Sequence, residues 1–223
     1  MLKLMTDSTT DCHMHTITYS DGFNSVDEMV IWAGKAGLKK IVITDHCQFY
    51  LDRYGYGKKS HRILTSRYKN IHNDVQVIFG IEADIMNDDG DVSLDIQGIP
   101  ADFIILSAHK NVFAGTESKI TQAYLKAIER FHDKIAFLGH LCSIYFEKYL
   151  DIDMVIKAAL ANGVDFELNC ANLANNKTNM KNLKKMLLQA DRLWVNSDAH
   201  TLEELMNLRK IGYEFLKDNS FTP

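Results

Sequence analysis

Thr9-Thr10-Asp11-Cys12-His13-Met14-His15 is the segment from which the fold prediction for this chain starts. Its first part, Thr9–Cys12, is short and β-prone, and it predicts a strand. Two histidines then follow at a spacing of two residues. Because successive side chains of an extended chain point to opposite sides, residues two apart point the same way. His13 and His15 can therefore hold one metal ion, while Cys12 and Met14 point away.

The same arrangement recurs along the chain. Six further short runs predict strands: Lys40–Ile43, Val75–Phe79, Asp102–Leu106, Ile135–Leu138, Val164–Leu168 and Leu193–Val195. Most are continuous apolar runs, as expected where both faces of a strand are buried. Helical patterns lie between them, and two of these open on capping boxes, at 25–28 and 201–204. Strands that alternate with helices predict a parallel sheet, and seven strands favour a small closed barrel.

Composition excludes several classes of protein. The chain has 223 residues, 46% hydrophobic and 24% charged, which suits one globular domain. No apolar run approaches the roughly 18 residues of a membrane helix, and the first ten residues carry no secretory signal, so we expect a cytoplasmic protein with no membrane contact. The net charge of -4 disfavours a nucleic-acid partner. The four cysteines form no C-x-x-C pair, which excludes a zinc finger and predicts reduced thiols.

Ligand-type side chains follow each predicted strand. They are Asp11, His13 and His15, then Asp45 and His46, Glu82, His109, His140, Glu167 and Asn169, and finally Asp198 and His200. In a parallel α/β barrel, the carboxyl ends of the strands share one rim, where active sites form. Imidazole and carboxylate are the ligands that suit zinc, manganese and iron. Any single pair is more often structural, but six of nine histidines at strand ends favour a metal cluster. We expect His61, His72 and His132 at the surface.

Six motifs carry a resemblance to a known family. They are D-C-H-M-H at 11–15, T-D-H at 44–46, G-I-E at 80–82, S-A-H at 107–109, G-H at 139–140 and S-D-A-H at 197–200. In this order, they resemble the PHP (polymerase and histidinol phosphatase) superfamily. The resemblance implies a distorted seven-stranded (β/α) barrel, with the metal site at the carboxyl-terminal rim of its strands. It also implies that residues 1–223 form a single PHP domain.

The resemblance further implies two or three divalent ions of zinc, manganese or iron. By motif, the first ion is held by His13, His15, Glu82 and Asp198. The second shares Glu82 and adds His109 and His140. The third is held by His46, His200 and the residue eight after the first histidine, which is often histidine in the family and is Asp21 here. A carboxylate can take that place, although the alternative is that Asp21-Gly22 is simply a turn.

Hydrolysis of a phosphomonoester is the leading hypothesis for function. Metal ions can supply hydroxide from bound water at neutral pH, and Asp198 and His200 are the candidates to exchange protons with it. The partner is then a small phosphorylated metabolite, with histidinol phosphate as one possibility. The alternatives are a PHP-type nuclease or phosphodiesterase, which the net charge disfavours, and an amidohydrolase-like C–N hydrolase. A non-catalytic metal-binding module is the fourth alternative. The sequence leaves the oligomeric state open.

Basic side chains that could hold the phosphate lie in the segment after the second strand. Arg53, Lys58 and Lys59 are the candidates there, and the tyrosines and glycines among them suggest a mobile loop. Lys110, directly after His109, is a second candidate. The alternative is a solvated surface loop, in which case attention moves to Lys110 and the Asn-rich segment from Asn172 to Asn179.

Overall fold

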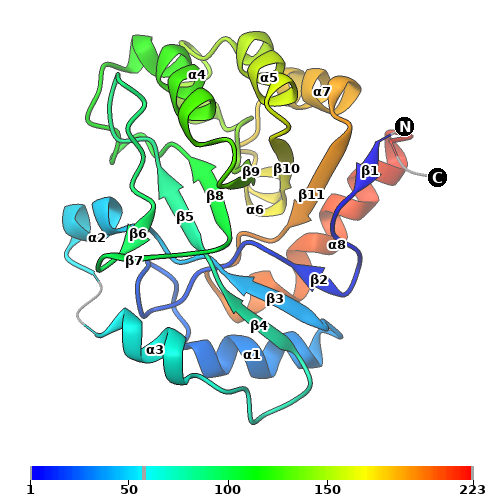
Figure 1. Cartoon of the computed structure of the whole chain (residues 1–223). Coiled ribbons are helices and arrows are strands. Elements are labelled where there is room, and N and C mark those ends of the chain that lie inside the picture. Colours follow the sequence, from blue (N-terminus) through cyan, green and yellow to red (C-terminus); the bar gives the residue numbers. More distant parts are fainter. Residues whose placement is uncertain (1, 57–58, 222–223) are drawn as a thin grey trace.

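The computed structural model describes residues 2–56 and 59–221 and shows a mixed α/β fold with mostly parallel strands (Figure 1). The larger sheet has six strands, in the order β1 (Lys3–Leu4), β11 (Arg192–Asn196), β10 (Asp165–Asn169), β9 (Ile135–Leu138), β8 (Ile104–Ser107) and β5 (Ile81–Asp84). The smaller sheet has three, β2 (Thr10–Asp11), β3 (Lys40–Ile43) and β4 (Gln76–Phe79). A short antiparallel hairpin pairs β6 (Asp95–Ile96) with β7 (Ile99–Pro100).

Helices cover the two sheets. They are α1 (Val26–Lys35), α2 (Gln48–Tyr54), α3 (His61–Arg67), α4 (Ile120–Phe131), α5 (Ile152–Ala161), α6 (Cys170–Ala174), α7 (Met180–Gln189) and α8 (Leu202–Asp218), with short 3₁₀ turns η1 (Glu117–Lys119) and η2 (Ile144–Phe146). Both predicted capping boxes form, at Ser25 before α1 and at Thr201 before α8. In each, the hydroxyl and the glutamate three residues later satisfy backbone N–H groups that the first turn leaves free.

The parallel arrangement is confirmed, but a closed barrel of seven strands is not. In the part of the chain that the structure describes, the strands form two sheets rather than one closed sheet. The sheets approach each other at the carboxyl ends of their strands through isolated parallel bridges, Met14 to Ala199 and His46 to Glu82. All four of these residues belong to the motifs predicted to bind metal, so the join between the sheets coincides with the candidate site.

Gly80 explains why the chain changes sheet. We expected Glu82 to follow the third strand, but it lies inside a separate strand, β5. Phe79 pairs with β3, whereas Ile81, two residues later, pairs with Ile104 of β8. A Cβ atom on Gly80 would lie 2.8 Å from the carbonyl oxygen of Phe103, so only glycine allows this close crossing.

Two apolar cores hold the sheets in place. Helices α4, α5 and α7 pack on the six-stranded sheet, and their residues join β-strand side chains such as Leu106 and Phe166 in one cluster (Figure 1). A second cluster joins Met29 of α1 to Ile41 of β3 and Leu205 of α8. Each fully buried aliphatic or aromatic side chain of this kind contributes about 1.5–3 kcal/mol. The rigid cores therefore fix the strand ends that carry the candidate site.

Three smaller expectations can be compared with the structure. All four cysteines are buried and unpaired with one another, as expected. His72 and His132 are exposed, but His61 is buried, with its ring edge-on to Tyr19 at 5.0 Å, so the expectation of a surface residue was wrong there. Among the described residues, no helix is long and apolar enough to cross a bilayer.

Candidate metal centre

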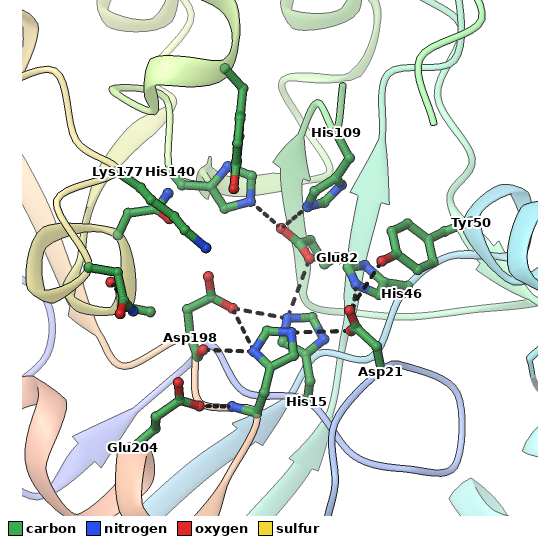
Figure 2. A pocket seen from close by; sticks show the side chains of 15 residues that line it. His15, Asp21, His46, Tyr50, Glu82, His109, His140, Lys177, Asp198 and Glu204 are labelled. Carbon is green, nitrogen blue, oxygen red and sulfur yellow. Dashed lines mark hydrogen bonds and ion pairs between the residues drawn. The ribbon is translucent and has the colours of Figure 1, made fainter. Parts of the chain in front are cut away.

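The predicted ligands converge on one pocket of about 330 Å³, where the two sheets meet (Figure 2). Those that line it are His15, Asp21, His46, Glu82, His109, His140, Asp198 and His200. His13 lies fully buried behind them, with Nε2 3.4 Å from Asp198 Oδ1. Residues separated by up to 187 positions in the chain thus share one site, because parallel strands bring their carboxyl ends together.

Glu82 occupies the centre of the cluster. Its carboxylate is almost fully buried, and its two oxygens face different histidines. Oε1 lies 2.8 Å from Nε2 of His140, and Oε2 lies 3.1 Å from Nδ1 of His46. Nε2 atoms of three further histidines lie at 3.4 to 3.6 Å, those of His15, His13 and His109. A carboxylate with imidazoles on both sides can bridge two cations.

Three overlapping groups of side chains could each hold a metal ion, because their ligand atoms lie within 4.8 Å of one another. The groups are His13, His15 and Asp198; His46, Glu82 and His109; and His15, Asp21, His46 and His200. His13 and His15 present their Nε2 atoms to each other at 3.3 Å, and both face the same oxygen of Asp198. Nitrogen and oxygen donors that converge in this way fit zinc, manganese or iron.

The far nitrogens of the histidines have partners of their own. Nδ1 of His13 lies 2.8 Å from Oε1 of Glu167, and Nδ1 of His109 lies 2.7 Å from Oδ1 of Asp84. A carboxylate in this position accepts a hydrogen bond from Nδ1–H, and this tautomer leaves Nε2 free to bind a metal. Nδ1 of His15 lies 2.8 Å from the hydroxyl of Ser20.

The supporting roles of Asp84, Ser20 and Glu167 were not predicted from the sequence. The alternation of side chains along a strand carried a signal for one of them, since Asp84 lies two residues after Glu82 and shares its face. Glu167 also accepts a hydrogen bond from the backbone N–H of His140 at 2.8 Å. It therefore orients two of the candidate ligands at once.

Burial and charged neighbours shift the pKa values of several side chains in the cluster. Burial opposes the ionisation of Glu82, but the nearby His109 and His13 outweigh it and hold the pKa of this carboxyl well below its usual range. Burial likewise opposes protonation of His109, yet Asp84 and Glu82 raise its pKa to about 10. At His15, burial lowers the pKa to about 3, with His200 adding to the effect. Glu82 is thus ionised near neutral pH, as a carboxylate that binds a metal must be.

Unusual backbone geometry occurs at two predicted ligands. Asp198 has φ 56° and His140 has φ 29°, in the left-handed region that most residues avoid. Such a residue costs on the order of 1–3 kcal/mol and persists where its surroundings enforce it. Here the N–H of Asp198 donates to the carbonyl of His13 at 2.9 Å, and Nδ2 of Asn169 donates to Oδ2 of Asp198 at 2.9 Å. These contacts direct Oδ1 of Asp198 into the pocket.

Asp21 reaches the site because the chain turns sharply at Gly22. A Cβ atom on Gly22 would lie 2.5 Å from the carbonyl oxygen of His15, so the turn requires glycine. The turn brings Oδ1 of Asp21 to 3.4 Å from Nε2 of His46 and 3.2 Å from Nε2 of His200. The Asp21-Gly22 pair is therefore a turn, and the turn places its carboxylate among histidines.

Among the described residues, the basic side chains predicted to bind phosphate do not line the metal pocket. Arg53 lies exposed on α2, in a segment expected to be a loop, and neither Arg53 nor Lys59 lines the pocket. Lys58 lies outside the described residues. Lys110 pairs with Glu117 at 3.3 Å and lines an adjoining hollow.

Lys177 lines the metal pocket, and Figure 2 shows its side chain directed into it. It belongs to the segment 172–179, which was only the second choice from the sequence. Its carbonyl accepts a hydrogen bond from the N–H of Ile144 at 3.0 Å, and its own N–H donates to the carbonyl of Asn172 at 2.8 Å. These bonds fix the backbone from which the ammonium group extends.

The fold and the site define an α/β protein with a centre of imidazoles and carboxylates suited to divalent metals. Residues 11–170 match the family described as the PHP domain, and the chain belongs to this family. It is 29% identical over 210 residues to a "probable phosphatase" of Aliivibrio fischeri (strain MJ11), covering 90% of this chain and 81% of that protein. It is also 30% identical over 213 residues to the DNA polymerase/3'-5' exonuclease PolX of Bacillus subtilis (strain 168), covering 89% of this chain but 35% of PolX.

A solved structure agrees with the family assignment. The histidinol phosphate phosphatase of Lactococcus lactis subsp. lactis Il1403, complexed with zinc, L-histidinol and phosphate, superposes with a TM-score of 0.54. The match covers 94% of both chains at 16% identity, so it shows a shared fold. The chain is therefore a PHP-family protein, and its ligand clusters are of the kind expected for a phosphatase-like hydrolase.

Proposed function

We propose that this protein hydrolyses phosphomonoesters of small metabolites with the help of two or three divalent metal ions. The observation that carries the proposal is the position of Glu82, whose two oxygens face separate groups of histidines around a pocket that also contains Lys177. The "probable phosphatase" relative and the phosphate bound by the Lactococcus enzyme support the same chemistry.

The nine predicted ligands would hold the metals as their motifs imply. His13, His15, Glu82 and Asp198 would hold the first ion, and Glu82 would share the second with His109 and His140. Asp21, His46 and His200 would hold a third. Ions bound there would activate water and offset negative charge on the phosphate.

Lys177 would take part in binding the phosphate. An ammonium group is a compact charge that donates to phosphate oxygens, and metal ions bound in the same pocket would offset the charge of the carboxylates that line it. Asn172 and Asn175 also line the pocket and can donate to further oxygens. We therefore transfer the phosphate-binding role from Arg53 and Lys59 to Lys177.

Asp198 and His200 are the candidates to orient water and exchange protons with it next to the pocket. Oδ2 of Asp198 is occupied by Asn169, so Oδ1 is the atom available on the pocket side. Nδ1 of His200 lies 3.0 Å from the carbonyl oxygen of Asp198, to which it can donate, and this leaves Nε2 facing Asp21. In the proposed reaction, water adds to phosphorus, the ester P–O bond breaks, and the alcohol leaves with a proton.

A phosphodiester substrate is the second candidate, because the PolX relative is named as a 3'-5' exonuclease and matches most of this chain. The net charge of -4 argues against a long nucleic acid. An amidohydrolase-like reaction has less support, because those sites commonly use a lysine on a middle strand, where this chain has Glu82 and His109.

A release assay separates these possibilities. The metal-loaded protein is incubated with a panel of phosphomonoesters, a phosphodiester and an amide, and phosphate or amine is measured. We expect phosphate from monoesters at a rate well above that from the diester, and loss of this activity in Asp198→Asn. A faster rate on the diester would favour the nuclease, and amine release alone would overturn the proposal.

A further inference from the structure

A second hollow opens directly beside the metal pocket. Its volume is about 230 Å³, and it is lined by Tyr50, Tyr54, His109, Lys110, Asn111 and Tyr145. Three of these residues, Tyr50, His109 and Tyr145, also line the metal pocket. A molecule whose phosphate lies at the metals can therefore extend its other end into this hollow without leaving the protein surface.

Aromatic rings form a series that leads from the metal ligands into the hollow. The ring of His46 stacks on Tyr50, with centroids 3.5 Å apart and planes 15° apart. Tyr50 contacts Tyr54 at 4.8 Å, and Tyr54 stacks with Tyr56 at 6.0 Å. Tyr50 is buried, and its hydroxyl donates to Oδ2 of Asp21 at 3.4 Å, so the inner end of the series is fixed to the site.

The outer rings are available to a ligand. Tyr54 and Tyr145 are each 43% exposed, although they carry large apolar faces next to a polar pocket. Gly55 has φ 75° and ends α2 directly after Tyr54, which fixes where this ring lies. Tyr145 is adjacent to Ile144, whose N–H donates to the carbonyl of Lys177. The ring of Tyr145 and the ammonium of Lys177 therefore come from two segments that are bonded to each other.

Polar groups at the edge of the hollow suit a substituted ring. Lys110 is paired with Glu117, but about half of its side chain is exposed. Asn111 is exposed beside it and offers both a donor and an acceptor. A purely alkyl leaving group would gain little from three phenol rings, whereas a planar ring with nitrogen or oxygen atoms on its edge can stack and form hydrogen bonds.

We propose that Tyr54, Tyr145 and Lys110 form a subsite for a planar aromatic ring on the leaving alcohol of the substrate. The inference rests on the proposed phosphomonoesterase function and narrows it to esters whose alcohol carries an aromatic or heteroaromatic ring. Hydrolysis then yields inorganic phosphate and the ring-bearing alcohol. A purine and a single imidazole share this chemistry, and the test distinguishes them.

The test compares phosphomonoesters with and without a ring on the leaving alcohol. Adenosine 5'-monophosphate and ribose 5-phosphate carry the phosphate on the same primary alcohol, and histidinol phosphate presents a smaller ring. We expect kcat/KM for at least one ring-bearing ester to exceed that for ribose 5-phosphate by roughly 5- to 150-fold, the range expected for one ring stacked on an aromatic side chain. The better of the two ring-bearing esters identifies the size of the ring.

Substitutions assign the effect to the subsite. Tyr54→Leu and Tyr145→Leu should each bring the ratio of kcat/KM values down toward one. Tyr54→Leu should also leave kcat/KM for ribose 5-phosphate unchanged, because Tyr54 is half-exposed and lines the second hollow but not the metal pocket. Tyr149→Leu is the matched control, since Tyr149 is 36% exposed and lines neither pocket. Equal values for all esters in the wild type, or an equal loss for all esters in the variants, would overturn the inference.

A binding measurement keeps the two proposals separate. Calorimetry with the metal-loaded protein should detect adenosine or histidinol, should detect no ribose, and should show weaker binding of the ring-bearing alcohol in Tyr54→Leu. If no ester releases phosphate, the proposed function fails, and this binding alone decides whether the subsite exists. If phosphate is released but neither alcohol binds better than ribose, the proposed function stands and the subsite is refuted.

Discussion

Glu82→Gln keeps the shape of the side chain at the centre of the site and removes its charge. If Glu82 bridges two ions, each ion loses the attraction of the same carboxylate. The imidazole nitrogens that would surround those ions lie 2.8 to 3.6 Å from its oxygens, on both sides. The glutamine can present its carbonyl oxygen to one side only, and it must turn its NH₂ group toward the other.

The size of the effect follows from the charge that is removed. Two opposite unit charges about 4 Å apart attract by about 4 kcal/mol at an effective dielectric constant near 20. The amide oxygen replaces part of this, so we expect each of two ions to bind about 100- to 1,000-fold more weakly.

Metal content after dialysis against buffers of defined free metal concentration measures this effect. Glu129→Gln, an exposed position on α4, is the matched control and should retain the wild-type content. Loss of a single ion would refute the bridging role, and retention of all ions would refute ligation by Glu82 altogether.

Three further predictions follow from the same geometry. Asp21→Ala should empty a third metal position and spare the other two, and anomalous scattering that shows a third ion in the variant would remove Asp21 from its ligands. Lys177→Met should lower kcat/KM at least tenfold with metal content unchanged. The comparison variants Lys181→Met on α7, Arg53→Ala and Lys59→Ala should keep kcat/KM near the wild-type value. The opposite ranking of these variants would favour the basic segment after β3 as the phosphate-binding site. Metal binding near pH 7.5 should release protons. Against the effect of burial, neighbouring carboxylates raise the pKa of His109 to about 10, and Asp21 and Asp198 raise that of His200 to about 9, so both histidines are protonated in the metal-free chain and must lose a proton to bind a metal. Calorimetry in buffers of different ionisation heats detects this release, and binding heats that do not depend on the buffer would contradict it.

Much of the site could be predicted because its pattern is local. In H-x-H and S-D-A-H, ligand-type side chains stand two residues apart at the end of a predicted strand, and alternation along an extended chain settles which side chains face together. The family motifs supplied the rest of the ligand set. The strands β3 and β9 lie where the apolar runs placed them, at Lys40–Ile43 and Ile135–Leu138.

Features that depend on contacts between distant segments could not be predicted in this way. Lys177 reaches the pocket from a segment that is hydrogen-bonded to the backbone N–H of Ile144, and no pattern in the sequence around either residue predicts this pairing. His61 is buried where α3 brings its ring edge-on to Tyr19, a residue distant in sequence. Closure of the barrel depends on pairing between whole strands, and the crossing at Gly80 is governed by the carbonyl of Phe103, which is distant in sequence.

A metal titration of the metal-free protein tests whether hydrolysis depends on two ions that Glu82 connects. After chelation, phosphate release from a phosphomonoester is measured as zinc, manganese or iron is added in steps, and the bound metal is counted at each step. We predict negligible activity below one equivalent and recovery that follows the binding of the second, because Glu82 connects two groups of ligands. Full activity without metal would contradict a metal-dependent reaction. Binding of at least two equivalents of metal with no phosphate release from any monoester would contradict phosphomonoester hydrolysis.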